Sequence, residues 1–308
     1  MARKPQLLRA LALGALLTVT LACSPKPEER RKSYAREFYA EALKNYREGD
    51  YGDALANFEK ALAYVEHLTP EEIRKAKYLL VKSAYLDKDY VNAAVYAEDF
   101  LATYPGGKEA EEVFFILIDS LVKVAPDPYR DQTYTVKAIK KAEEFLRLYP
   151  DSRYAPKVRE IVEEAKRKLA LHEYYVARFY EEYGYPYNAA VRYREVLLNF
   201  PEYFNEEELT YRYIKNLFET PKQVKLEREK LEELINEARK KLKEVRSEEE
   251  RRAIKNRIKF LLSEVKRWEE IAEKARREAL EALKRYKEVF GENEYYRKLL
   301  KLKAKWTS

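Results

Sequence analysis

Cysteine, histidine and glycine are scarce in this chain of 308 residues. Because Cys23 is the single cysteine, no disulfide can form within the chain. One cysteine and two histidines are also too few for the usual zinc site of four Cys and His ligands. Seven glycines leave no phosphate-binding loop of the GxGxxG or GxxxxGK[ST] type. No nucleophile–base pair stands out, so we expect a protein that is not an enzyme, holds no metal or cofactor, and is stabilised by packing.

A short apolar segment precedes the cysteine. Three basic residues lie within the first nine positions, and residues 11–21 are apolar apart from two threonines and one glycine. This run is shorter than the roughly 20 residues needed to cross a bilayer, but it has the length of the apolar region of a signal peptide. Small Ala22 then stands directly before Cys23. The pattern predicts a signal peptide over residues 1–22.

The stretch TLAC, residues 20–23, resembles a bacterial lipobox, in which cleavage leaves the cysteine as the first residue and lipid is attached to its sulfur. Thr20 departs from this pattern, which prefers leucine there. An ordinary secretory signal followed by a chance cysteine is therefore the alternative. A covalent lipid on Cys23 would hold the chain at a lipid bilayer, because each buried CH₂ group contributes about 0.8 kcal/mol.

The residues after the cysteine bear on location. Ser24 stands where an aspartate in such lipoproteins often signals retention at the inner membrane. We therefore expect a lipid-anchored protein on the periplasmic face of the outer membrane. Residues 23–33 are polar and contain proline, which predicts a tether.

The overall composition indicates an all-α protein. Hydrophobic residues make up 46% of the chain and charged residues 37%, and glycine is rare. Abundant Leu, Ala, Glu, Lys and Arg are typical of long helices. Valine and isoleucine occur at helical spacings rather than in alternation, so we expect almost no strand.

A pattern typical of paired helices recurs along residues 34–220. Around Gly49 the chain is YREGDYGDALANFEKAL, which resembles a tetratricopeptide repeat: a turn, then a small alanine that allows two helices to approach closely. The alanine recurs at positions 54, 93, 138 and 189. Prolines that end the pairs follow at 105, 150 and 201. We predict a solenoid of four repeats, with a degenerate fifth pair beginning near Glu206.

The first helix of each repeat lines the concave surface of such a solenoid. Alignment of the first two repeats with an offset of 39 brings three pairs of residues into register: Arg36 with Lys75, Tyr39 with Tyr78, and Tyr46 with Tyr85. These six residues predict a peptide-binding groove with a basic rim and a tyrosine floor. It would suit an extended peptide with an aromatic side chain and a terminal carboxylate. Alternatively, these tyrosines only pack between helices.

Residues 221–308 predict a long antiparallel helical hairpin and a tail. Thr220 and Pro221 are a good start for the first helix. A capping box at Ser247 and Glu250 begins the second, and Gly291 ends it. Apolar residues at alternating spacings of three and four form a coiled-coil-like seam. The second helix would be about 65 Å long and the first about 38 Å, so we expect its alanine-rich later half to lie against the solenoid or another protein.

Positive charge is concentrated in this last part. From residue 222 onward there are 27 Lys and Arg against 18 Asp and Glu, whereas the rest of the chain has 34 against 36. A solvated coiled-coil face is one interpretation. Attraction to anionic lipid headgroups or to an acidic partner is the second. Nucleic acid binding is the least favoured, because the signal exports the chain and no nucleic-acid recognition motif is present.

Two central segments are more specific than generic repeats. They are PDPYRDQTYTVKAIKKAEEFLRLYPDSRYA and LALHEYYVARFYEEYGYPYNAAVRYREVLLNFP, with their DQT loop and LAxxExxVAxxY run. They resemble the BamD family, the lipoprotein subunits of the outer-membrane β-barrel assembly machine. The resemblance covers roughly Cys23 to Phe218.

This resemblance implies a scaffold protein. We expect it to bind no nucleic acid, because the signal exports the chain and no recognition motif is present. The partners that the resemblance implies are the periplasmic domain of a BamA-like barrel subunit, bound through the C-terminal repeats, and unfolded outer-membrane protein precursors, bound through the N-terminal repeats. We expect Asp131, Glu173, Arg192 and Arg194 on the partner side, although Asp131 also suits a loop or helix cap and Glu173 a buried ion pair between repeats. The alternative function is another outer-membrane tetratricopeptide-repeat lipoprotein that coordinates pilus or cell-wall assembly.

Overall fold

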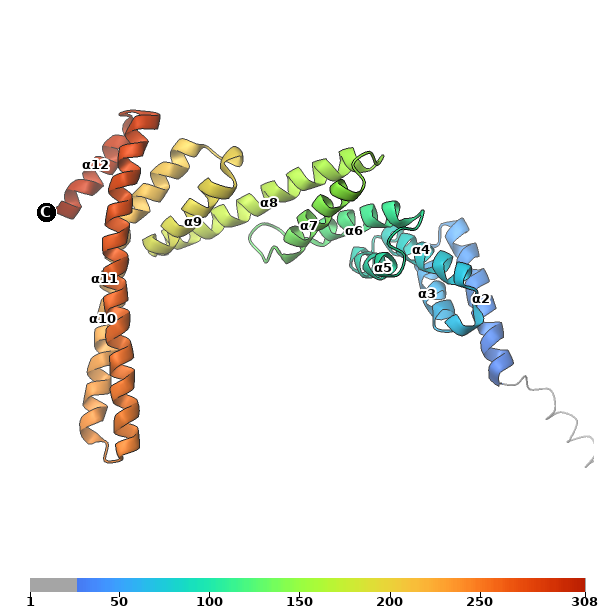
Figure 1. Cartoon of the computed structure of the whole chain (residues 1–308), viewed down its shortest axis with the longest axis horizontal. Coiled ribbons are helices and arrows are strands. Elements are labelled where there is room, and N and C mark those ends of the chain that lie inside the picture. Colours follow the sequence, from blue (N-terminus) through green and yellow to red (C-terminus); the bar gives the residue numbers. More distant parts are fainter. Residues whose placement is uncertain (1–26, 308) are drawn as a thin grey trace, which may run out of the picture. The chain divides into compact units, whose positions relative to one another are not determined.

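The computed structural model describes residues 27–307, so the predicted signal peptide and Cys23 lie outside the described residues. The described part contains helices and no strand, which confirms the all-α prediction (Figure 1). None of its helices is both long and apolar enough to span a membrane. The chain forms two compact units, the first comprising residues 27–125 and 137–162 and the second residues 126–136 and 163–307.

The first unit consists of successive helix pairs. Its helices are α2 (Pro27–Glu48), α3 (Tyr51–Leu62), α4 (Pro70–Leu86), α5 (Tyr90–Thr103), α6 (Ala110–Val124), most of α7 (Thr133–Leu148) and the start of α8 (Ala155–Glu182), with a 3-10 turn at Val65–His67. A fully buried phenylalanine on the second helix of each pair fills the core: Phe58, Phe100 and Phe145. The alanines that mark the repeats are fully buried as well, at positions 54, 93, 138 and 189. Their small size permits the close approach of neighbouring helices.

The turns inside three pairs share one geometry. In each, one residue has a positive φ: Gly49 at +90°, Lys88 at +66° and Gly184 at +78°. In each, a tyrosine before the turn meets one after it edge to face, with ring centroids 5.7 to 6.4 Å apart: 46 with 51, 85 with 90, and 180 with 185. The first two turns are 39 residues apart, which confirms the register predicted from the sequence.

Lys88 occupies a backbone conformation that costs an L-residue with a side chain about 1 kcal/mol. We expect Lys88→Gly to raise the free energy of unfolding of the α4–α5 pair by 0.5 to ~1 kcal/mol, because glycine adopts this φ without strain. Hydrogen exchange of the α4 and α5 amides measures the change. Gly49→Lys is the matched reverse variant: a Cβ at Gly49 meets no atom within 4 Å, so only backbone strain should lower the stability of α2 and α3. Equal hydrogen-exchange rates in the unaltered protein and both variants would contradict the predicted strain at Lys88.

Two sequence-based boundaries need correction. Helix α2 begins at Pro27, so residues 27–33 of the predicted tether are helical; proline suits the first helical position, and Glu28 and Glu29 favour the helix N-terminus. A helix also does not begin at Pro221, because α10 (Glu206–Glu244) runs through it.

Packing explains why α10 continues through a proline, which costs about 3 kcal/mol within a helix. Leu217, Phe218 and Val224 on either side of it are buried. The buried Gln223 also holds this part of the helix to α9 (Pro186–Asn199): its Oε1 accepts from the backbone N–H of Tyr187 at 2.9 Å, and its Nε2 donates to Oδ1 of Asn188 at 2.7 Å. These interactions keep the residues before and after Pro221 in one continuous helix.

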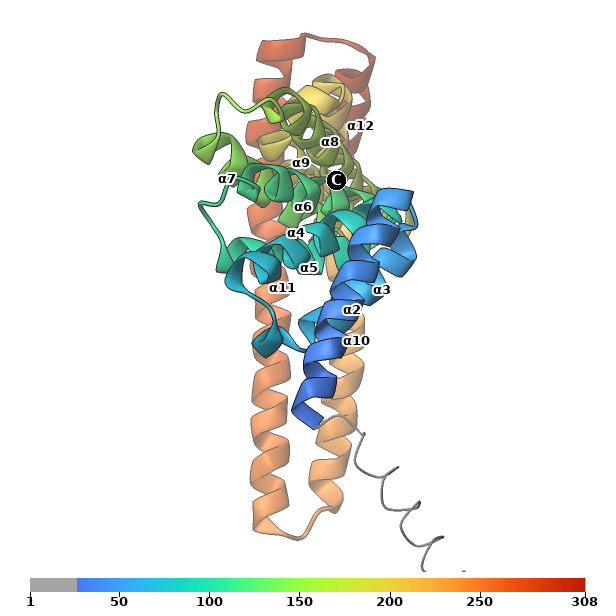
Figure 2. The same ribbon diagram turned by 90° about the vertical axis from the view of Figure 1, so that its right-hand side faces the viewer.

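The second unit is built on the predicted hairpin. It contains the end of α8, then α9, a 3-10 turn at Pro201–Tyr203, α10, α11 (Glu248–Phe290) and α12 (Glu294–Thr307). Gly291 ends α11 with φ +76°, as the sequence predicts. Of the predicted capping box, one half is present: the Ser247 hydroxyl accepts from the backbone N–H of Glu250 at 3.5 Å. The antiparallel course of α10 and α11 is seen in both views (Figures 1 and 2).

The alanine-rich half of α11 lies in the core of this unit. Ala275 and Ala279 are fully buried in a cluster with residues of α9, α10 and α12, which confirms that this half packs against the last repeat. Helix α12, expected only as a tail, covers α10: Tyr295 stacks on Tyr211 with ring centroids 4.4 Å apart. The turn between α10 and α11, at the opposite end of the hairpin, lies away from this core (Figure 1).

Candidate protein-binding surfaces

The six predicted groove residues lie on α2 and α4 of the first unit, but their environments differ. Tyr39 is only 9% exposed, and its ring packs against Phe58. Arg36 forms an ion pair with Glu72 of α4. Tyr39 is therefore a core residue, and the charge of Arg36 is already partnered within the chain.

The phenols of Tyr78 and Tyr85 are held by α6. Tyr78 donates to Glu112 at 2.6 Å and Tyr85 to Asp119 at 2.7 Å, while Lys82 pairs with Glu112 at 3.0 Å. Burial and the hydrogen bond to Glu112 raise the pKa of Tyr78 to about 12, so it remains a donor at neutral pH. Sequence reasoning missed Lys82 and both carboxylates, because helix contacts 34 residues apart leave no local pattern.

Tyr46 and Lys75 remain available for a ligand. Tyr46 is half-buried against Tyr51, and Lys75 is exposed. Within the described part of the chain, neither the hydroxyl of Tyr46 nor the ammonium of Lys75 makes a hydrogen bond or ion pair. The peptide-binding groove stays a prediction, and these two residues are its most accessible members.

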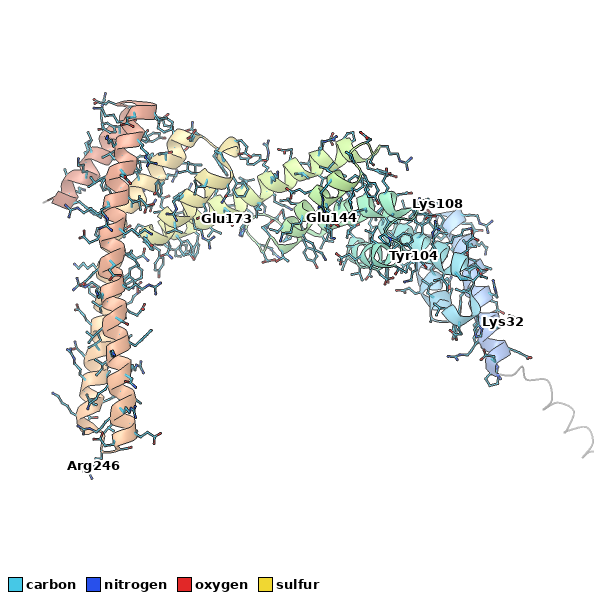
Figure 3. The ribbon with its side chains drawn as sticks, viewed as in Figure 1. Lys32, Tyr104, Lys108, Glu144, Glu173 and Arg246 are labelled. Carbon is cyan, nitrogen blue, oxygen red and sulfur yellow. The ribbon has the colours of Figure 1, made fainter. Side chains whose placement is uncertain are left out.

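Two of the predicted partner-binding residues meet in the second unit. Arg192 of α9 donates to Glu173 of α8 at 3.1 Å, and both side chains are partly exposed (Figure 3 labels Glu173). Glu173 therefore forms a partly exposed ion pair within the fourth helix pair, and the alternative of a buried ion pair between repeats is wrong. We call Arg192 and Glu173, together with the loop at residues 126–132, the α8–α9 surface.

The DQT loop is fastened to α8. His172 lies with Nδ1 2.7 Å from the carbonyl oxygen of Pro128, and the rings of Tyr129 and Tyr175 are 4.8 Å apart. Buried Gln132 donates to two loop carbonyls at 2.9 Å, and its Oε1 accepts from Thr135 at 2.7 Å. The loop therefore has a fixed conformation that presents exposed Tyr129.

Asp131, in the same loop, accepts from the backbone N–H of Thr133 at 3.0 Å. Hydrogen bonding with Thr133 holds the pKa of Asp131 below its ordinary value, so its exposed carboxylate is charged at neutral pH. The loop-capping role is therefore present, and direct partner contact by Asp131 stays a prediction.

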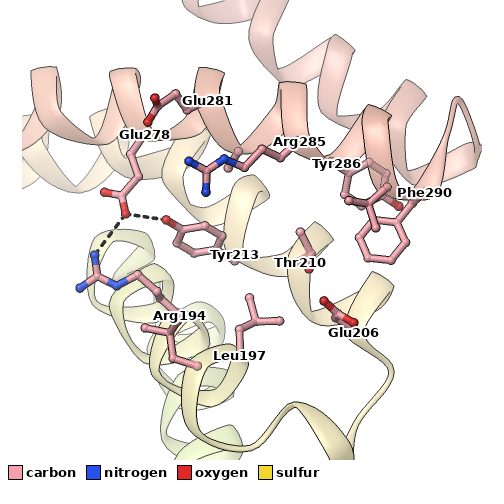
Figure 4. Close-up of a pocket in the computed structure, with 13 residues that line it drawn as sticks. Arg194, Leu197, Glu206, Thr210, Tyr213, Glu278, Glu281, Arg285, Tyr286 and Phe290 are labelled. Atoms are coloured by element: carbon pink, nitrogen blue, oxygen red, sulfur yellow. Dashed lines mark hydrogen bonds and ion pairs between the residues drawn. The ribbon is translucent and has the colours of Figure 1, made fainter.

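Arg194 faces the hairpin instead. Its Nη1 donates to Glu278 of α11 at 3.1 Å, and the same carboxylate accepts from the hydroxyl of Tyr213 at 2.5 Å (Figure 4). These groups lie at one side of a cavity of about 400 Å³, which is also lined by residues such as Leu197, Arg285, Tyr286 and Phe290. The guanidinium of Arg194 is therefore partly engaged within the chain, and its contact with another protein stays a prediction.

A buried carboxylate that sequence reasoning missed holds α8, α9 and α10 together. Glu181 accepts from Tyr193 at 2.5 Å, Arg212 at 3.0 Å and Lys215 at 2.8 Å. Burial alone would raise its pKa, but the hydrogen bonds from Lys215 and Tyr193 outweigh burial and hold the pKa below the ordinary value. Glu181 is one of 54 acidic residues, and no local signal separates it from the others.

Comparison with known proteins assigns the chain to a family. Residues 31–231, about two thirds of the chain, match the YfiO family, described as outer membrane lipoprotein. The chain belongs to this family. A protein of Aquifex aeolicus (strain VF5), provisionally named outer membrane protein assembly factor BamD, is 70% identical over 308 residues, the full length of both chains. Outer membrane protein assembly factor BamD of Caulobacter vibrioides is 24% identical over 149 residues, 48% of each chain. The predicted resemblance to the BamD family is confirmed.

Proposed function

We propose that this chain is an outer membrane protein assembly factor, a non-enzymatic scaffold that a lipid on Cys23 anchors to the periplasmic face of the outer membrane. The observation that carries the proposal is the 70% identity to the Aquifex assembly factor over the full length of both chains. Membership of an outer membrane lipoprotein family supports the location and favours this function over pilus or cell-wall assembly. Stacked helix pairs with buried alanines and fixed turns are suited to presenting surfaces to other polypeptides.

The partner of the α8–α9 surface is the periplasmic domain of a BamA-like barrel subunit. The surface combines the partly exposed ion pair of Arg192 and Glu173 with a loop fixed by His172 and Gln132. A fixed backbone reduces the entropy lost on binding, and exposed charges select the partner.

The test is the affinity of the chain from residue 24 onward for that domain, measured by calorimetry. Arg192→Glu places two carboxylates together and should weaken binding about tenfold or more. Arg159→Glu, at an exposed arginine of α8 in the first unit, is the matched charge-reversal control and should leave the affinity unchanged. Absence of binding by the unaltered chain would overturn this partner, and equal effects of the two variants would overturn the surface.

The groove of α2 and α4 binds unfolded outer-membrane protein precursors. Tyr46 supplies an aromatic ring, and Lys75 supplies a cation for a terminal carboxylate. Tyr46→Ala combined with Lys75→Glu should weaken binding of a peptide with an aromatic C-terminal residue about tenfold. Fluorescence anisotropy of the labelled peptide measures this. Lys108→Glu, at a highly exposed lysine outside the groove, is the control. Unchanged affinity in the double variant would remove the groove from the proposal.

A further inference from the structure

Positive charge is concentrated around the turn of the α10–α11 hairpin. We define residues 239–259 as the hairpin tip; it contains ten Lys and Arg against four Glu. Figure 3 labels Arg246 in this turn. Three of the four glutamates lie in the first turn of α11, where the partial positive charge of a helix N-terminus already favours them. The remaining surface of the tip is therefore strongly cationic.

Nine of the ten basic side chains of the tip form no intramolecular ion pair within the described part of the chain. Arg251 has a carboxylate oxygen of Glu248 at 4.0 Å. Within residues 239–259, all of which the structure describes, the other nine lysines and arginines are exposed and form no ion pair. This differs from the rest of the hairpin, where pairs such as Arg228 with Glu269 connect the two helices. The charges of the tip are consequently available to an external partner.

Exposed apolar side chains accompany these charges on α11. Phe260 is 61% exposed and Leu262 is 46% exposed. Lys255 and Lys259 precede Leu262 by seven and three residues, and Lys266 follows it by four. These spacings place the four side chains on one face of the helix. Apolar residues flanked by lysines on an exposed helix face are typical of segments that bind at a membrane interface.

We propose that the hairpin tip docks on a bilayer surface through anionic phospholipid headgroups. Clusters of four to eight Lys and Arg bind such surfaces, and Leu262, which shares a helix face with three lysines, adds to the binding by entering the headgroup region. The cations lie on both helices and on the turn that joins them, where Figure 3 labels Arg246, an arrangement that suits mobile headgroups better than a single rigid acidic partner. The contact uses residues remote in sequence from Cys23 and acts as a second membrane attachment whether or not Cys23 carries lipid.

Vesicle sedimentation tests this proposal. The protein is the chain from Ser24 to Ser308, which retains every described residue but lacks the apolar leader and Cys23. We expect it to bind vesicles that contain one third phosphatidylglycerol, and not to bind vesicles of phosphatidylethanolamine and phosphatidylcholine alone. The bound protein should dissociate as the salt concentration increases. Each basic residue near an anionic surface contributes about fivefold to the binding constant. Binding should therefore fall at least ~50-fold in a variant with four tip lysines replaced by glutamine: Lys240→Gln, Lys241→Gln, Lys255→Gln and Lys259→Gln.

A control variant loses the same net charge elsewhere in the second unit. Its four lysines are exposed and lie outside the tip: Lys274→Gln, Lys284→Gln, Lys301→Gln and Lys303→Gln. It should bind within about threefold of the unaltered chain if attraction is local to the tip. In a further variant, Leu262→Ser should weaken binding about fivefold without changing the dependence on salt, whereas Phe260→Ser, on a different helix face, should leave the affinity unchanged.

Three results would overturn the proposal. The first is equal binding to anionic and neutral vesicles, and the second is an equal loss in the tip and control variants. The third is binding of polyglutamate through the tip lysines with no binding to anionic vesicles, which would assign the tip to an acidic protein. Circular dichroism of each variant checks that the helices are intact.

Discussion

Replacement of Glu181 by alanine is expected to lower the free energy of unfolding of the second unit by about 3 kcal/mol. The carboxylate is 9% exposed and accepts from Tyr193, Arg212 and Lys215. Its removal leaves the fully buried Tyr193 hydroxyl without an acceptor and two partly buried cations without their shared counter-charge. Urea unfolding at pH 7 measures the loss. Tryptophan fluorescence reports on this unit alone, because both tryptophans, Trp268 and Trp306, lie in it.

The adjacent residue provides the control. Glu182 is 57% exposed and, within residues 27–307, forms an ion pair with Arg178 alone, one turn away. Glu182→Ala should therefore change the free energy of unfolding by less than about 0.5 kcal/mol. Similar losses in the two variants would show that Glu181 contributes only a surface charge.

The same carboxylate makes the second unit sensitive to acid. Because the pKa of Glu181 is lower in the folded state than the ordinary 4.5, its stabilising effect is complete above pH 4.5 and is lost as the pH falls through the folded pKa. Stability of the unaltered protein should consequently fall more steeply below pH 4.5 than that of Glu181→Ala. If the free energies of unfolding of the two proteins fall in parallel with pH, ionised Glu181 does not stabilise the second unit.

Removal of the predicted lipid attachment should move the chain from the membrane pellet to the salt-washed soluble fraction. Each acyl chain at Cys23 would contribute about 0.8 kcal/mol of membrane-binding free energy for every buried CH₂ group. Summed over the acyl chains, this exceeds by far the binding free energy that exposed charges of the protein contribute at high salt. A Cys23→Ala chain that keeps its leader would still carry an apolar segment of 11 residues. The variant therefore replaces residues 1–23 with an ordinary cleavable secretory signal. Fractionation of cells at low and high salt measures the distribution.

Salt separates the two membrane contacts in this experiment. The unaltered protein should resist a high-salt wash, whereas the variant without Cys23 should retain only salt-sensitive contacts, those of the hairpin tip with lipid and of the α8–α9 surface with its partner. Adding the four tip substitutions together with Arg192→Glu should release it at low salt. A variant without Cys23 that resists high salt would contradict the lipid anchor while leaving the test of the tip with vesicles unaffected.

Features encoded locally were predictable from the sequence. The turns are specified by two tyrosines and a small alanine within about ten residues, with glycine at the positive-φ position of the first and third turns and Lys88 at that of the second. The register of the first two repeats therefore follows from one alignment. Helices α5, α7 and α9 each end two residues before a proline, because proline disfavours helical geometry in the residue before it.

Features set by distant contacts were not predictable. Thr220 and Pro221 have the sequence signature of a helix start. Helix α10 nevertheless continues through Pro221, because the neighbouring residues are buried and Gln223 is hydrogen-bonded to α9. The groove was predicted from equivalent positions on two helices, whereas the burial of Tyr39 depends on how α2 packs on α3. The partner of Arg194 lies 84 residues away, on α11.

Helix α12 has a consequence for crowding on a membrane. A stack of repeats that stops without a cover exposes an apolar face on which another molecule can continue the stack. Here fully buried Leu299, together with Tyr295 and Trp306, occupies that face from within the chain. If the proposed lipid on Cys23 concentrates the molecules on a membrane, this face of the described second unit is therefore already covered and does not offer a neighbouring molecule a place to continue the stack.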